Sequence, residues 1–407
     1  MKRCVFIVAA AAPMHLASAA AGEWDIGAEV AGEVRYFPTS PLFPEQLERW
    51  QPSATFQPDI RWESDDRRHQ FVLTPFARVD AQDEARTHVD LREAYYRYTA
   101  DNGWSVLAGA AKVFWGRTES RHLVDIINQT DAAEDIDEED KLGQPMINVT
   151  APTSVGTFDV FLLSGFRTRT FPGEDGRLRF DPVVDTDAEI ISRKGGRGAV
   201  DIAGRYSHYV GGWDFGLSIF HGTSREPRFA LGPDSIRPVY DKITQGSLDL
   251  QYTKDAWLLK FEGLVREGQG DTFFAGVGGF EYTLYQLFGS NADLGLLVEY
   301  QYDGRDEGVV MESYGPALAA PVTAADNDVF AGARLGFNDA QDASALVGVS
   351  VDAEDQSMGM FIEASRRIGS NWTAELETRL FFNADPGNIA SAFRRDDFLT
   401  LRLTRYY

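Results

Sequence analysis

Ser120, His122 and Asp125 bring the three side-chain types of a hydrolase triad into one short stretch, AKVFWGRTESRHLVDIINQTD, at residues 111–131. A triad works only when its members converge in space, and three members within six residues of chain rarely do so. The context TESRHL also lacks the paired glycines of a nucleophile elbow. We therefore predict that the protein is not an enzyme. The hydrolase alternative requires a hydroxyl within hydrogen-bond reach of His122 or His221.

The densest run of charge in the chain follows directly, at residues 131–140. Its carboxylates are Asp131, Glu134, Asp135, Asp137, Glu138, Glu139 and Asp140. Such a run suits a divalent-cation site or a vestibule that attracts cations. The calcium-loop pattern fails, because the glycine of its sharp turn is missing. The sequence favours a solvated extracellular loop and predicts no metal site and no cofactor; whether this loop binds a divalent cation is left open.

Residues 1–21 have the three parts of an export signal. A basic pair comes first, an apolar core occupies residues 4–16, and small residues follow. We predict cleavage after Ala19 or Ala21, which removes the only cysteine. Residues 22–407 are then expected to fold without disulfides, as one barrel domain for the reasons below.

Composition narrows the class of protein. The formal net charge of −23 excludes nucleic acid as a partner, because phosphate binding needs a basic face. Hydrophobic residues make up 43% of the chain, and after the signal no apolar run is long enough for a membrane helix. The chain is therefore either a soluble exported domain or a barrel that hides its lipid face in alternate residues.

The dominant hydrophobic period is two, which is typical of half-buried strands. Trp24, Ile26 and Val30 share one face of the first segment, and charged residues share the other. We predict eighteen strands, with sixteen as the alternative; even numbers are typical of bacterial barrels. The predicted strands cover residues 23–37, 53–64, 68–81, 86–100, 103–115, 144–152, 156–166, 197–210, 211–221, 245–254, 256–268, 273–287, 291–303, 328–338, 341–353, 356–368, 371–384 and 395–407.

Long and short links alternate along these strands. Longer links follow the odd strands, and tight turns such as GG at 211–212 and DAQ at 339–341 follow the even ones. Two odd links, 267–272 and 353–356, are short. Alternation of this kind indicates an all-β, transmembrane, antiparallel meander barrel with long extracellular loops and short periplasmic turns.

Tryptophans support the barrel, because indole rings prefer the boundary between membrane and water. Seven of the eight lie near predicted strand ends, and Trp50 lies in a loop. Phe114 and Trp115 are expected near the outer interface. The seven are Trp24, Trp62, Trp104, Trp115, Trp213, Trp257 and Trp372.

Charged residues fall on the predicted inward faces and carry both signs. A lumen lined in this way has a field across its water, although lumen positions also need to be polar for solvation alone. Both interpretations are left open, as is the position of the arginine-rich loop 167–196. The pore-lining candidates are Glu29, Glu33, Arg35, Asp249, Lys260, Glu262, Arg266, Glu299, Arg334, Glu375, Glu377, Arg379 and Arg402. The pore-mouth loop candidates are His122, Asp125, Asn128 and Asp131.

Several motifs resemble those of known outer-membrane proteins. DLREAYYRY, followed by VLAGAAKVFWG and VDIINQTD, resembles a segment of proteobacterial outer-membrane porin-like proteins, and GGFEYTLYQLFGSNADLGLLVEYQYDGR is similar to a second shared hairpin. The last segment, FLTLRLTRYY, resembles the C-terminal targeting strand of such barrels, with Leu399, Leu401, Leu403 and Tyr407 as the assembly signal. The resemblance implies a barrel in the outer membrane of a Gram-negative bacterium, and it offers no catalytic residues.

These features together predict an outer-membrane porin-like channel for passive diffusion of small hydrophilic solutes. The expected partners are outer-membrane lipid and lipopolysaccharide, the barrel-assembly machinery and small solutes; a homo-oligomer is left open. The alternatives are an export conduit for a polymer, which needs a basic lumen, an outer-membrane hydrolase, and a soluble exported β-protein.

Overall fold

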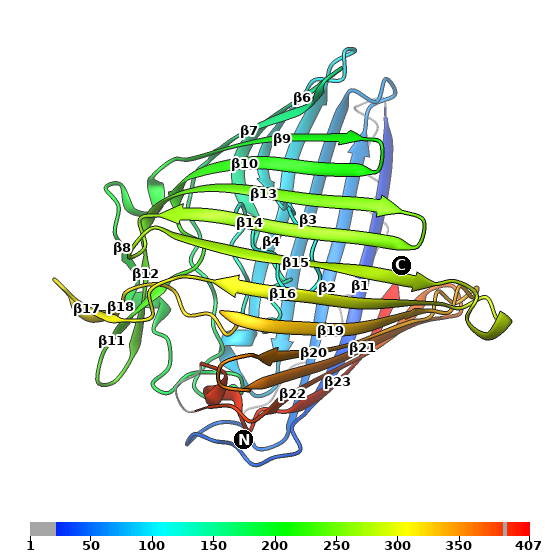
Figure 1. Cartoon of the computed structure of the whole chain (residues 1–407). Coiled ribbons are helices and arrows are strands. Elements are labelled where there is room, and N and C mark those ends of the chain that lie inside the picture. The colour runs from blue at the N-terminus through cyan, green and yellow to red at the C-terminus, as the bar shows by residue number, and fades with distance from the viewer. Residues whose placement is uncertain (1–21, 386–388) are drawn as a thin grey trace, which may run out of the picture.

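Eighteen strands form one closed sheet in the computed structural model, which describes residues 22–385 and 389–407. The predicted signal peptide, residues 1–21, lies outside the described residues. Each barrel strand pairs antiparallel with its neighbours, and β1 (Glu23–Tyr36) pairs with β23 (Phe398–Tyr406), which closes the barrel (Figure 1). Closure gives every strand a partner on both sides, as hydrocarbon surroundings demand. The predicted fold class and strand number are confirmed.

The barrel strands follow the predicted positions closely. The largest differences are four residues at one end: β5 ends at Ala111 rather than at residue 115, and β9 begins at Asp201 rather than at residue 197. Between β1 and β23 the barrel strands are β2 (Trp50–Glu63), β3 (His69–Asp80), β4 (His88–Thr99), β5 (Ser105–Ala111), β6 (Gln144–Thr153), β7 (Gly156–Leu163), β9 (Asp201–Val210), β10 (Trp213–Thr223), β13 (Lys242–Lys254), β14 (Trp257–Glu267), β15 (Phe273–Leu284), β16 (Asp293–Asp303), β19 (Asn327–Gly336), β20 (Ser344–Asp352), β21 (Met358–Ile368) and β22 (Trp372–Phe382). Short 3-10 helices lie in the links: η1 (Glu84–Arg86), η2 (Thr186–Ala188), η3 (Gly196–Gly198), η4 (Leu287–Gly289) and η5 (Ile389–Phe393).

A second, smaller sheet is built from three of the long loops, and the sequence did not predict it. Its five strands run in the order β17, β18, β11, β12, β8. They lie beyond the loop end of the barrel, opposite the end where the short turns lie (Figure 1). Their bounds are β8 (Ile190–Ile191), β11 (Arg228–Leu231), β12 (Ile236–Tyr240), β17 (Val309–Glu312) and β18 (Gly315–Leu318).

The outer face of the barrel is apolar, and a girdle of tryptophan side chains surrounds its turn end. Trp24 and Ile26 on β1 are 51% and 62% exposed, although both are large and apolar. Exposed apolar side chains in alternate positions form the surface that a membrane covers. Six of the eight tryptophans lie at the turn end: Trp24, Trp62, Trp104, Trp213, Trp257 and Trp372.

Among the described residues, no helix is long and apolar enough to span a membrane.

Candidate pore and its constriction

The cross-strand register places all thirteen predicted pore-lining residues on the inner face of the barrel. On β14, for example, Lys260, Glu262 and Arg266 alternate with the outward Trp257 and Leu259. Polar groups inside and apolar groups outside match the division between a wet lumen and a lipid face. Most of these inner charges, however, do not face open water, because a loop occupies much of the lumen.

Loop 112–143, between β5 and β6, lies inside the barrel. We call it the constriction loop. Val124, Ile126 and Ile127 are almost fully buried, and they pack against inward apolar residues of β5, β6, β7, β9, β10 and β13. The wall residues of this apolar seat are Leu107, Ala111, Met146, Phe161, Leu163, Ala203, Phe220 and Ile243. Burial of this apolar surface stabilises the constriction loop in its inward position. It also explains why the strands that contact the loop carry apolar residues on their inner as well as their outer faces.

Trp115 lies in the same apolar cluster, and its predicted place at the outer interface is wrong. Its side chain is 5% exposed, and its ring is edge-on to Phe161 with centroids 5.7 Å apart. The guanidinium of the inward Arg205 lies over the ring, 5.1 Å from its centroid. The indole is therefore inside the lumen, because β5 ends four residues earlier and the chain turns inward from there.

The first arm of the constriction loop, residues 117–121, is held by carboxylates of β13, β14 and β16. Glu262 is fully buried and accepts hydrogen bonds from the backbone N–H groups of Arg117 at 2.5 Å and Thr118 at 3.0 Å. Glu299 accepts from the N–H and the hydroxyl of Ser120, at 2.8 and 2.6 Å. Ion pairs join Arg117 to Asp249 and Arg121 to Asp303. Buried carboxylates with several donors are well satisfied here.

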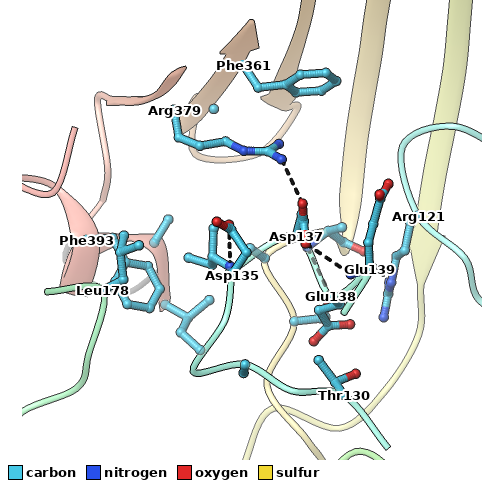
Figure 2. A pocket seen from close by; sticks show the side chains of 18 of the residues that line it. Arg121, Thr130, Asp135, Asp137, Glu138, Glu139, Leu178, Phe361, Arg379 and Phe393 are labelled. Carbon is cyan, nitrogen blue, oxygen red and sulfur yellow. Dashed lines mark hydrogen bonds and ion pairs between the residues drawn. The ribbon is translucent and has the colours of Figure 1, made fainter. Parts of the chain in front are cut away.

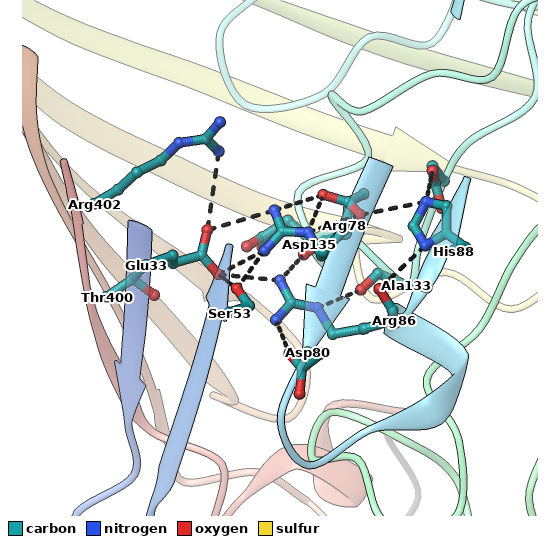
Figure 3. A network of polar contacts seen from close by, with 12 residues as sticks. Glu33, Ser53, Arg78, Asp80, Arg86, His88, Ala133, Asp135, Thr400 and Arg402 are labelled. Carbon is teal, nitrogen blue, oxygen red and sulfur yellow. Dashed lines mark hydrogen bonds and ion pairs between the residues drawn. The ribbon is translucent and has the colours of Figure 1, made fainter. Parts of the chain in front are cut away.

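The second arm, residues 131–137, is held by arginines from the opposite wall (Figure 3). Arg78 of β3 contacts Glu134 at 2.6 Å, and Arg92 of β4 contacts Asp131 at 2.7 Å. The further ion pairs are Arg35 with Asp135 and Arg379 with Asp137. The preference for a solvated extracellular loop is therefore wrong for the first part of the acidic run, since Asp131 and Glu134 are 0% and 4% exposed.

Arg86 of η1 joins this arm to the wall through its backbone. It donates to the carbonyls of Ala133 and Glu134 at 2.8 and 3.0 Å, and it pairs with Asp80 and Glu33 at 2.8 and 3.2 Å. Figure 3 shows Arg86 and Arg78 side by side between Glu33 and the loop. A guanidinium in which each of the three nitrogens has an acceptor is held in one orientation, and this fixes the position of the arm.

The pKa values of two buried loop carboxylates shift in opposite directions. Burial alone would raise the pKa of Asp131, but the hydrogen bond to His88 and the charge of Arg92 lower that pKa to about 2. Burial and the neighbouring Asp135 raise the pKa of Asp137 to about 8, against the attraction of Arg379. Asp131 therefore stays ionised, whereas Asp137 titrates near neutral pH.

The predicted pore-mouth residues all lie in the constriction loop. Asn128 ties the loop's two ends together, donating to the carbonyls of Ala111 and Leu142 and accepting from the N–H of Val113. Asp125 forms an ion pair with Lys141 at 3.3 Å. His122 packs edge-on against Phe114, with ring centroids 4.8 Å apart.

The three residue types of a triad do not form one. The hydroxyl of Ser120 donates to Glu299, and no hydrogen bond joins Ser120 to His122 within residues 22–385 and 389–407. His221 does have a hydroxyl in reach, since its Nδ1 is 2.9 Å from Oγ1 of Thr244. That pair lies on the outer face, where His221 is opposite Ile202 and Thr244. No carboxylate contact to the imidazole of His221 occurs among the described side chains.

A cavity of about 530 Å³ remains between the constriction loop and strands β19–β22. Figure 2 shows Asp137 directed toward Arg379, with Phe361 beside it and Glu138 and Glu139 on the loop side. Twelve acidic and nine basic residues border the cavity. The water-exposed ones, such as Glu138 and Glu139, are acidic, whereas most of the basic ones are buried in ion pairs. The exposed surface of the cavity is therefore acidic.

The other predicted wall residues divide into bound and solvated groups. Arg266 is buried and pairs with Glu226, and Arg379 also pairs with Glu377 at 2.8 Å. Lys260 and Arg334 both contact Glu119 of the constriction loop. Arg402 contacts Glu375 at 3.6 Å and Glu33 at 3.9 Å, and Glu29 lies on the same inner face.

Loop 164–200 is bound over the lumen through Arg177, one of the basic residues of the arginine-rich loop 167–196 whose position the sequence left open. Its side chain is fully buried, and it pairs with Asp396 at 2.6 Å. It also donates to the carbonyls of Thr39 and Glu48 at 3.3 and 3.1 Å. Three long loops are thereby joined above the barrel.

Of the assembly-signal residues, Leu401, Leu403 and Tyr407 are exposed on the outer face, which leaves their role in assembly a prediction.

Arg78, Arg86 and Arg92 were missed as site residues. Arg78 and Arg92 lie in predicted strands and Arg86 at the start of one, but none forms a motif with the acidic run 131–140. The useful signal was an arginine at an inward position of each strand, Arg78 in β3 and Arg92 in β4, because such a side chain needs acidic partners once it is buried.

Comparisons with known proteins give the fold and no closer relationship. No family model matches the chain, and the curated proteins include no match. Among solved structures, Pseudomonas aeruginosa OccK3 (OpdO) is similar with a TM-score of 0.52 and 10% identity, over 94% of this chain and 95% of that one. A BenF-like porin from Pseudomonas fluorescens Pf-5 has a TM-score of 0.51 and 10% identity, over 94% and 98% of the two chains.

A third neighbour has a different described role. Wzi is an Escherichia coli outer-membrane protein involved in group 1 capsule assembly and a carbohydrate-binding β-barrel; its TM-score is 0.52 at 9% identity, over 93% of this chain and 83% of that one. The likenesses define the class of fold: a closed barrel of the kind found in outer-membrane porins. At these identities they extend no further than the fold.

Proposed function

We propose that the protein is an outer-membrane channel through which small hydrophilic solutes diffuse passively. The observation that carries the proposal is the constriction loop, which is fixed to the inner wall on several sides and leaves a cavity of about 530 Å³ along β19–β22. A hollow, water-accessible barrel with an ordered internal loop is suited to selective diffusion. The likeness to a BenF-like porin supports the same function.

The acidic surface of this cavity favours cations. Exposed carboxylates raise the local concentration of cations and oppose the entry of anions. Basic residues such as Arg379, opposite Asp137, also border the cavity, so we expect a weak preference rather than exclusion of anions. Neutral solutes small enough for the cavity should also pass.

Single-channel recording tests this function directly. The refolded protein in a planar bilayer should give stepwise currents, and a salt gradient should give a reversal potential that indicates cation preference. Membrane-inserted protein with heat-modifiable gel mobility but without any conductance would rule the channel out.

A second candidate is a role in the passage or binding of a surface polysaccharide. The likeness to the carbohydrate-binding barrel Wzi is the observation that favours it, together with the loops joined through Arg177 over the lumen. An anionic polymer requires a basic path, and the acidic surface of the cavity argues against one. Retention of the protein by immobilised capsular oligosaccharides, without conductance, would favour this candidate.

Catalysis is not part of our proposal. Ser120 is hydrogen-bonded to a wall carboxylate, and His221 faces outward with only a threonine hydroxyl beside it. Incubation of the folded protein with phospholipid vesicles should release no fatty acid. The expected surroundings are outer-membrane lipid and lipopolysaccharide, reached through an export signal and the barrel-assembly machinery.

A further inference from the structure

Three polar residues lie side by side on the inner wall near the loop end of β16, β19 and β20. Asp328 is the cross-strand partner of Gln301 on one side and of Asp352 on the other. Directly opposed side chains on one face of a sheet lie about 5 Å apart at Cβ, and like charges in that arrangement repel. The pairing of Asp328 with Asp352 is therefore unfavourable unless something neutralises it.

The oxygens of this row are buried and incompletely satisfied. Asp328 is 4% exposed, and its Oδ1 accepts from the hydroxyl of Ser350 at 3.2 Å, while Oδ2 has no hydrogen-bond partner. Gln301 is 3% exposed, and its amide oxygen also lacks a partner. A buried oxygen without a partner costs free energy, so two of them in adjacent positions indicate a missing ligand.

A third carboxylate completes the group. Asp326, Asp328 and Asp352 each offer an oxygen within 4.8 Å of the others. The row borders the cavity through Asp328, Asp352 and Gln301, so an ion from the lumen can reach it.

The contrast with the other acidic groups of the lumen is informative. Asp131 and Glu134 in the constriction loop are each matched by an arginine. Among the described residues, no lysine or arginine forms an ion pair with Asp328 or Asp326. The protein thus compensates Asp131 and Glu134 with its own arginines and leaves Asp326 and Asp328 without such partners among the described residues.

We propose that Asp326, Asp328 and Asp352, with the amide oxygen of Gln301, form a binding site for a divalent cation, and that the cation is Ca²⁺. Ca²⁺ takes carboxylate and amide oxygens in flexible geometry, whereas Mg²⁺ demands a stricter octahedron and keeps more of its water. Charge count favours a divalent ion, because one Ca²⁺ offsets most of three adjacent carboxylates. The site does not depend on conduction and is independent of the proposed function.

The test compares the wild-type protein with Asp328→Asn in thermal unfolding. Lipopolysaccharide-free, refolded full-length barrel is heated in detergent with a chelator or with CaCl₂ at about 5 mM, above the ~0.1–1 mM dissociation constants of extracellular calcium modules. Ca²⁺ should raise the unfolding temperature of the wild type by several degrees and leave the variant unchanged. With chelator the variant should have the higher unfolding temperature. The asparagine removes the like-charge repulsion, and its amide oxygen still accepts a hydrogen bond from Ser350.

Controls make the result specific. Asp65→Asn, in the exposed turn between β2 and β3, should keep the wild-type response to Ca²⁺. Asp326→Asn changes only the loop end of the site, so it serves if Asp328→Asn does not fold, and titration calorimetry with CaCl₂ should show at least about tenfold weaker binding. An equal Ca²⁺ shift in the wild type and the site variants, or no Ca²⁺ shift in the wild type, would overturn the proposal.

Discussion

The two arms of the constriction loop are bound to the barrel in opposite ways. The first arm, residues 117–121, offers mostly backbone N–H groups, and the wall of β14 and β16 meets them with carboxylates. The second arm, residues 131–137, offers carboxylate side chains, and the wall of β3 and β4 meets them with arginines. The sign of the charge on each wall follows from what the loop presents to it.

This difference explains why both signs occur on the inner faces. A mixture of inward charges suggested a field across the lumen, yet Glu33, Glu262 and Glu299 are committed to holding arginines or loop N–H groups. Buried charges in fixed pairs contribute to structure first, and only the exposed ones act on passing ions. The acidic side of the cavity is thus the part of the lumen that can select solutes.

The second arm should be the more sensitive, and Arg86→Met should have the largest effect. Arg86 holds two loop carbonyls and two wall carboxylates, and its loss leaves Glu33 and Asp80 buried with fewer partners. Removing one side of such a buried network costs about 3–5 kcal/mol. We expect this loss in urea unfolding, together with a larger single-channel conductance because the arm is released.

Arg61→Met is the matched control for that variant. Arg61 also points inward and pairs with Asp59 at 2.8 Å, but its side chain is 53% exposed. An exposed ion pair contributes about 0–1 kcal/mol, so this variant should unfold nearly like the wild type. Equal losses in the two arginine variants would mean that the second arm is not held through Arg86.

A substitution in the apolar seat tests the contribution of packing separately from that of the ion pairs. Ile127 is fully buried against the inner wall, and Ile127→Ala removes that packing without touching either arm. A buried Ile→Ala change costs about 2–5 kcal/mol, and we expect a loss within that range. Stability should fall while conductance stays close to the wild-type value. A conductance gain as large as that of Arg86→Met would show that the seat, and not the second arm, positions the loop.

The first arm should tolerate a single change better. Glu262→Gln keeps a carbonyl oxygen for the N–H groups of Arg117 and Thr118 but loses the charge. Hydrogen bonds to charged groups contribute about 1.5–3 kcal/mol, and Glu299 continues to hold the next two residues. We expect a loss at the lower end of that range, measured by urea unfolding. A loss above that for Arg86→Met would reverse the ranking of the arms.

The barrel strands could be predicted from the sequence, whereas the position of the constriction loop could not. Trp24, Ile26 and Val30 reveal their strand because each reports its own face, and eighteen such patterns with alternating link lengths define the barrel. The constriction loop has no local pattern of this kind. Its acidic run resembles a solvated loop because Arg78 and Arg92 lie about forty residues or more away in the chain, and only closure of the barrel brings them together.

The sequence also misplaced residues at the end of β5. The strand pattern of β5 continues through Val113 and Trp115, so the alternation alone predicts a longer strand. In the structure Asn128 accepts from the N–H of Val113 and donates to the carbonyl of Ala111, so the chain leaves the sheet at that point. A side-chain amide that replaces ladder hydrogen bonds cannot be recognised from strand periodicity.

The smallest expected effect concerns selectivity on the cavity side of the lumen, where Asp137 pairs with Arg379 and also borders the cavity. The pKa of Asp137 is raised to about 8 by burial and by Asp135, so this carboxyl gains its charge as pH rises from 6 to 9. Cation preference, measured from reversal potentials, should therefore increase over that interval, by roughly twofold or less for one charge in a wide pore. The pKa of Asp137 in the folded protein lies above that of a carboxyl in the unfolded chain. The free energy of unfolding should therefore fall as pH rises from about 4 to about 8. Asp137→Asn should weaken the pH dependence of selectivity, whereas Asp131→Asn should leave it in place, since Asp131 stays ionised throughout. An undiminished pH slope in Asp137→Asn would assign the titration to another group facing the cavity.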